Sequence, residues 1–192
     1  MICEQWFPTP IWHGIFDGIN ETQYNNAIKY CKELAAHHPG RKISNDGWQS
    51  DDFFNTNSIP LQVFFDKIKP AVKQAHLDFG ITRNLSITNF WININYKNCK
   101  NTYHDHPGSS LSGVFYLTKK NSDIVFERNR DVSSYHLSWL LSKKNTPLTY
   151  DTVRYTPQQG QFLIFPSWLF HGVDSNINEE ERISVSFNIS FI

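Results

Sequence analysis

Three histidines in this sequence could bind one metal ion if the fold brings them together. His104 and His106 are separated by one residue, whereas His171 lies far along the chain. Residues i and i+2 of a strand face the same side, so His104 and His106 can both reach one ion while Asp105 points away. Because imidazole is a good ligand for iron, zinc, copper and nickel, the pattern predicts a three-histidine metal site.

Each of these histidines also has a simpler interpretation. Pro107 follows His106 at once, which would also suit a surface loop. The apolar run before His171 would also suit a buried histidine that is hydrogen-bonded to backbone. If residues 104–106 do not form a regular strand, Asp105 could bind the metal in place of His106.

Arg182 and Ser184 share the polar face of the last predicted strand, in which polar and apolar residues alternate. A guanidinium is costly to bury without an anion. Arg182 therefore either faces solvent, meets an internal acid or binds the carboxylate of a ligand, to which Ser184 could add a hydrogen bond. Together with the histidines, this pair predicts a site for a metal and a carboxylate.

Two amphipathic helices are predicted in the first half of the chain. One covers residues 20–36, with Asn20 or Thr22 as its cap, and the other covers 59–79, with Ser58 as its cap. A proline inside the second helix is expected to kink or split it.

After Gly80 the hydrophobic pattern changes from the helical period to alternation. Strands are expected over residues 85–96, 111–118, 124–127, 161–165 and 182–192, with a short one near 149–155. In the first of them, Phe90 and Ile92 face one side while Trp91 and Asn93 face the other. Helices followed by strands predict an α+β fold, mainly β, with an antiparallel sandwich or barrel.

Bulk composition restricts the classes of protein to which the chain can belong. It has 192 residues and a formal net charge of zero, so no field is expected that would attract nucleic acid or an anionic membrane. The three cysteines form no close pair, and the N-terminus has no signal-peptide pattern, which together favour a cytoplasmic protein. We expect a single domain, residues 1–192, with helical support over 20–79 and a β core over 85–192.

The segments around these polar residues resemble the 2-oxoglutarate/Fe(II)-dependent dioxygenase superfamily, and within it a small group of oxygenases found in bacteria and their phages. The likeness is strongest in residues 104–116, 165–173 and 181–188, and weaker support comes from residues 7–10, 47–50 and 91–93. The resemblance implies a double-stranded β-helix, which is a jelly-roll sandwich with helices bracing one sheet. It also implies that the protein is located in the cytoplasm of a bacterium or of a phage-infected host cell.

Residue by residue, the resemblance implies that three side chains bind Fe(II), namely His104, His106 and His171. Arg182 and Ser184 would bind the far carboxylate of 2-oxoglutarate, and Tyr116 or Asn93 would add a hydrogen bond to it. The chain departs from the family at His106, because the family usually has an acid there.

By the same resemblance, the protein would be a dioxygenase that uses dioxygen, hydroxylates an unidentified primary substrate and releases succinate and CO2. Three histidines with an open position are also typical of catalytic zinc. The alternatives are therefore a three-histidine thiol oxygenase or zinc hydrolase that does not use 2-oxoglutarate, and a non-catalytic jelly-roll binding module. Residues 38–58 and 119–160 are expected to determine the substrate, and nothing in the sequence indicates an oligomeric state.

Overall fold

The computed structural model describes residues 2, 7–43, 47–55, 57, 59–119, 122–128, 146–147 and 149–191. The elements in chain order are β1 (Trp12–Ile15), α1 (Glu21–His37), β2 (Arg41–Ile43), β3 (Gly47–Gln49), α2 (Gln62–Asp78), β4 (Leu85–Asn95), β5 (Asn101–His104), β6 (Leu111–Tyr116), β7 (Ile124–Glu127), β8 (Thr152–Tyr155), β9 (Gln161–Pro166), β10 (His171–Val173) and β11 (Arg182–Phe191). The predicted class, mainly β with two helices, is confirmed.

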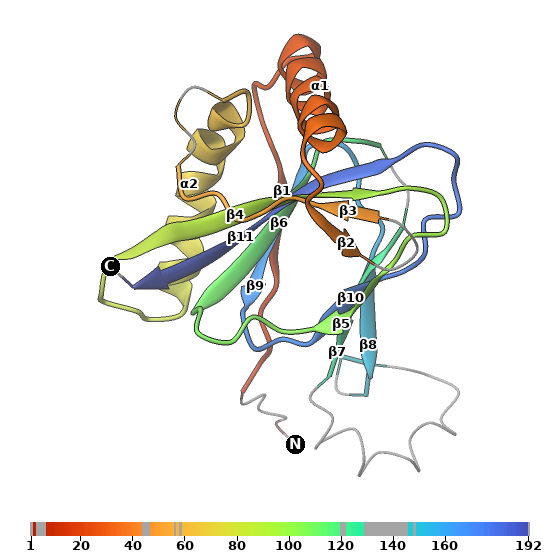
Figure 1. Ribbon diagram of the computed structural model, residues 1–192. Helices are drawn as coiled ribbons and strands as arrows, with labels where there is room; N and C mark the ends of the chain where they lie inside the picture. The colour runs from red at the N-terminus through yellow and green to blue at the C-terminus, as the bar shows by residue number, and fades with distance from the viewer. Residues whose placement is uncertain are drawn as a thin grey trace.

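Two antiparallel sheets form the body of the molecule (Figure 1). The larger sheet has seven strands in the order β1-β9-β6-β11-β4-β3-β2, and the smaller has four in the order β5-β10-β7-β8. A small apolar cluster joins the sheets, with Phe165 of β9 against Phe126 of β7 at 4.9 Å between ring centroids. A pocket lies where residues of β5 and β10 face strands of the larger sheet.

Both helices cover the far face of the larger sheet and bury most of the hydrophobic core. Phe64 of α2 stacks on Phe115 of β6 at 5.4 Å, and both side chains are fully buried. Burying such a side chain contributes roughly 1.5–3 kcal/mol. The helices therefore hold the sheet from behind and leave its other face for the site.

The helix boundaries agree with prediction at α1 and differ at α2. Asn20 caps α1 through a capping box with Gln23, so Thr22 is not the cap. α2 begins at Gln62, later than predicted, and the predicted cap Ser58 lies outside the described residues. Neither helix in the described part of the chain has the length and hydrophobicity that a membrane span requires.

α2 also continues through Pro70 as one helix, so the expected split does not occur. A proline inside a helix costs about 3 kcal/mol. Buried side chains lie on both sides of Pro70, among them Phe65, Ile68 and Val72. Their burial, at roughly 1.5–3 kcal/mol each for full burial, outweighs that cost and keeps the two halves of the helix on one surface.

The expected order of helices followed by strands is wrong for the first part of the chain. β1 precedes α1 and pairs with β9, while β2 and β3 lie between the helices and extend the sheet beyond β4. These strands contain only three or four residues each, too few for alternation to show. The two faces of β4, in contrast, are as predicted, because Phe90 and Ile92 join the core while Trp91 and Asn93 line a pocket.

Candidate active site

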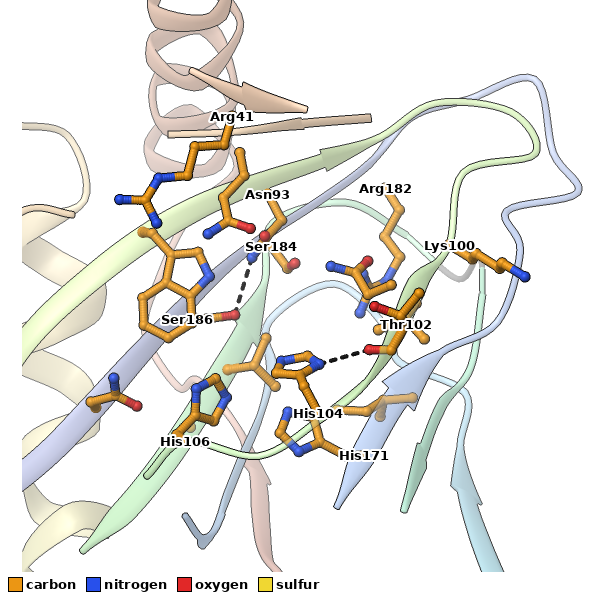
Figure 2. A pocket seen from close by; sticks show the side chains of 18 of the residues that line it. Arg41, Asn93, Lys100, Thr102, His104, His106, His171, Arg182, Ser184 and Ser186 are labelled. Atoms are coloured by element: carbon orange, nitrogen blue, oxygen red, sulfur yellow. Dashed lines mark hydrogen bonds between the residues drawn. The ribbon is translucent and has the colours of Figure 1, made fainter. Parts of the chain in front are cut away.

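Three histidine side chains meet between the two sheets (Figure 2). His104 ends β5, His171 begins β10, and the two are direct cross-strand partners. Within the described residues, His104, His106 and His171 each offer a ligand atom, and these atoms lie within 4.8 Å of one another. The structure thus brings together the three residues that the sequence predicted as ligands.

His106 reaches this cluster by a route that differs from the predicted one. β5 ends at His104, so His106 lies in the loop that follows and strand alternation does not place it. Its backbone N–H donates to the Ser167 carbonyl at 2.9 Å, and its ring lies 5.4 Å from the Trp91 indole. Asp105 is exposed and does not belong to the cluster, so the geometry does not favour it as a ligand.

Backbone carbonyls fix the orientation of two of the imidazoles. His104 Nδ1 lies 2.7 Å from the Thr102 carbonyl, and His171 Nδ1 lies 2.8 Å from the Leu169 carbonyl. A carbonyl oxygen can only accept, so each Nδ1 carries the hydrogen and each Nε2 keeps its lone pair. This is the tautomer that a metal-binding histidine needs.

Burial also keeps His106 and His171 uncharged. Burial and, to a smaller extent, the charge of neighbouring His104 lower the pKa of His171 to about 3 and that of His106 to about 4. Both imidazoles are therefore neutral at neutral pH. A buried set of neutral nitrogen ligands suits a divalent metal such as iron or zinc.

The second part of the site is formed by Arg182 at the start of β11. Its side chain is only 2% exposed, its Nη1 donates to Asn95 Oδ1 at 3.3 Å, and its guanidinium lies 4.9 Å from the centre of the Tyr116 ring. Its Nε has no hydrogen-bond partner. No acid in the described part of the chain forms an ion pair with it. Arg182 is therefore not exposed to solvent and meets no acid among the described residues, so its guanidinium is available to the anion of a ligand.

The neighbours of Arg182 differ in what they can contribute. Ser184 is buried and lines the same pocket, with Asn93 as its cross-strand partner. Asn93 donates through Nδ2 to Ser186 Oγ at 3.1 Å, while its Oδ1 has no partner. Tyr116 is fully buried beneath Arg182, its hydroxyl has no partner, and burial raises its pKa, so the phenol remains protonated.

One cavity of about 540 Å³ joins the histidines to Arg182. Such a volume lies within the usual range for small-molecule sites, roughly 300–1,000 Å³. Three of the buried polar atoms without a partner, on Asn93, Tyr116 and Arg182, belong to residues at this end of β4, β6 and β11. Unpaired buried polar atoms are destabilising, and their grouping here fits a bound carboxylate ligand beside a metal.

Sequence reasoning identified the outer residues of the site and missed the residues that hold them. Asn95 fixes Arg182, and Trp91 lies against His106. Both share the face of β4 that carries Asn93, so alternation along this strand is the signal that could have found them. The carbonyls that orient the histidines leave no signal in the sequence, because every residue has one.

Comparison with known proteins gives a consistent result. Residues 89–188 match the family model described as "Putative 2OG-Fe(II) oxygenase". No curated protein matches the chain. Among solved structures, EctD from S. alaskensis superposes with a TM-score of 0.65 at 13% identity, covering 95% of this chain and 73% of that one.

Two further structures are similar over most of their length. A prolyl-4-hydroxylase from Pseudomonas putida has a TM-score of 0.62 at 9% identity, covering 96% of this chain and 94% of its own. A prolyl hydroxylase from Trichoplax adhaerens, solved with a peptide fragment of a hypoxia inducible factor, has a TM-score of 0.64 at 8% identity, covering 94% and 83%. At these identities the likeness establishes the fold, and the predicted jelly-roll architecture is confirmed.

Proposed function

Because the chain belongs to the family of 2OG-Fe(II) oxygenases, whose model matches more than half of its length, we propose that it is an Fe(II)- and 2-oxoglutarate-dependent dioxygenase that hydroxylates a primary substrate. One observation carries the proposal. A cluster of three histidines and a buried guanidinium that meets no acid among the described residues line the same polar cavity.

In this proposal His104, His106 and His171 bind the iron. Three neutral imidazoles leave the full charge of +2 on the metal, in contrast to the two-histidine, one-carboxylate set that is typical of such oxygenases. The dianion 2-oxoglutarate balances that charge. The missing acid therefore makes iron binding depend more on the co-substrate than it does in a site with a carboxylate ligand.

Arg182 and Ser184 bind the far carboxylate of 2-oxoglutarate. Arg182 offers its unpaired Nε, and Asn95 and the Tyr116 ring hold the guanidinium in place without neutralising it. Bound together, iron and 2-oxoglutarate supply oxidative decarboxylation of the keto acid to succinate and CO2, coupled to insertion of one oxygen atom of O2 into a C–H bond. Contacts of Tyr116 or Asn93 with the co-substrate stay predictions.

Apolar side chains surround the histidine end of the cavity. The Phe165 ring lies 4.7 Å from the His171 ring, and Val114 and Ile124 line the same space. Phe165 and Val114 come from the larger sheet and Ile124 from the smaller one, so apolar side chains of both sheets exclude water from this end of the cavity and strengthen electrostatic interactions there.

The proposal is tested by measuring succinate formed from 2-oxoglutarate in air with added Fe(II). We expect succinate production that requires both Fe(II) and 2-oxoglutarate and is lost in His171→Ala and Arg182→Gln. Isothermal titration of the Mn(II)-loaded protein with 2-oxoglutarate gives a second readout that needs no primary substrate. If the protein neither forms succinate nor binds 2-oxoglutarate, the proposal is wrong.

A second candidate is a three-histidine metalloenzyme that does not use 2-oxoglutarate. It is favoured by the composition of the metal cluster, which has no carboxylate ligand among the described residues. Three histidines with an open position suit a zinc-bound water. This candidate predicts metal binding without any effect of 2-oxoglutarate, and it leaves Arg182 buried without an anion.

A further inference from the structure

We propose that the primary substrate is a small molecule with a carboxylate or phosphate group, and that Arg41 binds this group at the outer end of the pocket. The inference rests on the proposed function, because it concerns a second molecule that occupies the cavity beside 2-oxoglutarate.

The charges that line the cavity are mostly positive. Among the described residues, its charged side chains other than the histidines are Arg41, Lys42, Lys100, Arg182 and one acid, Asp52. The chain as a whole has 18 basic and 18 acidic residues, so this excess is local. An iron ion and a 2-oxoglutarate dianion cancel each other's charge and leave the excess in place. A second anionic ligand is the partner that such a lining attracts.

Cross-strand pairing places Arg41 on the face of the sheet that carries the site. Arg41 pairs with Gln49 of β3, Gln49 with Asn93 of β4, and Asn93 with Ser184 of β11. Cross-strand partners point to the same face, and strands lie about 4.8 Å apart, so the Cα atoms of Arg41 and Ser184 are roughly 14 Å apart. An anion at Arg41 is therefore distinct from the carboxylate at Arg182.

The close view of the pocket separates the two cationic regions. Arg41 lies on the side of Asn93, whereas Lys100 lies beyond Arg182 on the opposite side (Figure 2). Lys100 is thus nearer the proposed co-substrate end, and Arg41 is the cation that faces the rest of the cavity. Arg41 comes from an edge strand of three residues, and its side chain is 64% exposed and accessible to a ligand.

The neighbouring acids in the described part of the chain do not satisfy Arg41. Its Nε lies 3.7 Å from Asp51 Oδ1, but both side chains are exposed, and such pairs contribute little. Asp52 accepts a hydrogen bond from Asn89 at 3.0 Å. The two Nη groups of Arg41 remain able to form the forked contact that guanidinium makes with carboxylate or phosphate.

Asn93 indicates a second property of the substrate. Its unpaired atom is Oδ1, which can only accept a hydrogen bond. A carboxylate offers no hydrogen, so an N–H or O–H group of the primary substrate is the matching partner. The row from Arg41 to Asn93 therefore fits a polar molecule that combines an anionic group with a hydrogen-bond donor, and the cavity of about 540 Å³ limits it to small-molecule size.

The test compares how tightly probes of similar size but different charge bind near the metal. The protein is loaded with Mn(II) and saturated with 2-oxoglutarate, and the paramagnetic relaxation of probe protons reports binding close to the ion. The probes share the same α-carboxylate and α-ammonium groups and differ in the side-chain group: L-aspartate, its isostere L-asparagine with no net charge, O-phospho-L-serine and L-2,4-diaminobutyrate with a net positive charge. Aspartate and phosphoserine distinguish a carboxylate from a phosphate as the preferred group.

We expect an anionic probe to bind about tenfold more tightly than asparagine, since hydrogen bonds between two charged groups are stronger than those to a neutral group. Arg41→Gln should remove most of this preference, and Arg41→Gln with Lys42→Gln all of it. The matched control is Lys29→Gln, which removes one charge from the exposed face of α1, away from this cavity. It should keep the preference.

Two outcomes overturn the inference. One is no preference for anionic probes in the wild-type protein, including the case in which no probe binds. The other is a preference that persists in the Arg41→Gln/Lys42→Gln variant. Failure of the proposed function is seen separately, as the absence of Mn(II)-induced relaxation of 2-oxoglutarate itself. The aspartate and asparagine comparison is also made without 2-oxoglutarate, so that this failure does not prevent the charge test.

Discussion

The two ends of the pocket differ in charge, because one buries neutral histidines and the other buries a charged arginine. At the histidine end, burial holds the pKa of His106 at about 4 and that of His171 at about 3, so these side chains stay neutral and need no counter-charge. At the other end Arg182 is buried and cannot lose its charge, yet the side chain that accepts its hydrogen bond is the neutral amide of Asn95. The two buried histidines therefore need no bound metal to balance a charge, whereas the charge of Arg182 is balanced only when an anion binds.

This difference follows from how each end is built. The histidines come from the short strands β5 and β10 and the loop after β5, and local carbonyls orient two of them. Arg182 and Asn95 are cross-strand partners at one end of β4 and β11, which are the longest strands in the described structure. The long strands supply the rigid frame that a charged group needs when it is held without an internal acid.

The largest expected effect comes from removing a ligand at the metal end. His171→Ala should lower Fe(II) or Mn(II) affinity by more than about 100-fold, because even outer contacts to metal ligands are worth 10- to 100-fold. Binding is measured by titration of the metal-free protein. His38→Ala, which truncates an exposed histidine after α1, serves as the control and should bind metal normally. Equal metal affinity in His171→Ala would remove this residue from the proposed site.

The next effect tests the unpaired charge at the arginine end. Asn95→Asp places a carboxylate where the amide oxygen now lies 3.3 Å from Arg182 Nη1. The internal acid should satisfy Arg182 and weaken 2-oxoglutarate binding by about tenfold to 100-fold, in line with 1.5–3 kcal/mol for a charged hydrogen bond. Isothermal titration of the Mn(II)-loaded protein measures it.

A purely structural role for Asn95 gives a different result. If Asn95 mattered only for folding, Asn95→Asp would lower the melting temperature of the ligand-free protein, whereas neutralisation of Arg182 should maintain or raise it. Asn26→Asp, on the exposed surface of α1, adds the same charge elsewhere and should leave 2-oxoglutarate affinity unaltered. Unweakened 2-oxoglutarate binding in Asn95→Asp would contradict the role given to Arg182.

The third effect concerns pH and the metal-free protein. Below the ordinary histidine pKa of about 6.5, the unfolded chain binds a proton at residue 171 that the folded chain excludes down to about pH 3. The free energy of unfolding therefore falls as the pH falls through this window. Between pH 6 and pH 4, His171→Gln should make the free energy of unfolding less dependent on pH, by up to about 1.4 kcal/mol per pH unit. Denaturant titrations across that range measure it, and identical slopes in both proteins would contradict the buried neutral state.

The two ends also differ in how far the sequence predicts them. The arginine end lies on β4 and β11, where long alternation identifies the face of each residue, and Arg182, Ser184 and Asn93 are found where alternation places them. At the metal end the residues are the predicted ones, but the argument for His106 is wrong, because β5 ends at His104. Short strands carry too few residues for a period to appear, and loop geometry depends on tertiary contacts.

The same reason explains the parts of the fold that the sequence did not predict. β1, β2 and β3 lie at or next to an edge of the larger sheet. They are extended because β1 forms backbone hydrogen bonds with β9, β3 with β4, and β2 with β3. Arg41 owes its place in the pocket to such a strand. The sequence therefore does not predict the proposed role of Arg41 in substrate binding, because only the pairing of Arg41 with Gln49 places it on the face that carries the site.

The smallest expected effect is at His106, where the family usually has an acid. His106→Asp supplies a carboxylate ligand and neutralises part of the metal charge, so metal affinity should be retained within about tenfold, whereas His106→Ala should lose more than that, as for any lost ligand. A carboxylate at position 106 should also make metal binding less dependent on 2-oxoglutarate. Titrating metal into each variant with and without 2-oxoglutarate measures both effects. If His106→Asp and His106→Ala bind metal equally poorly, the loop after β5 positions an imidazole only, and the site is specialised for three neutral ligands.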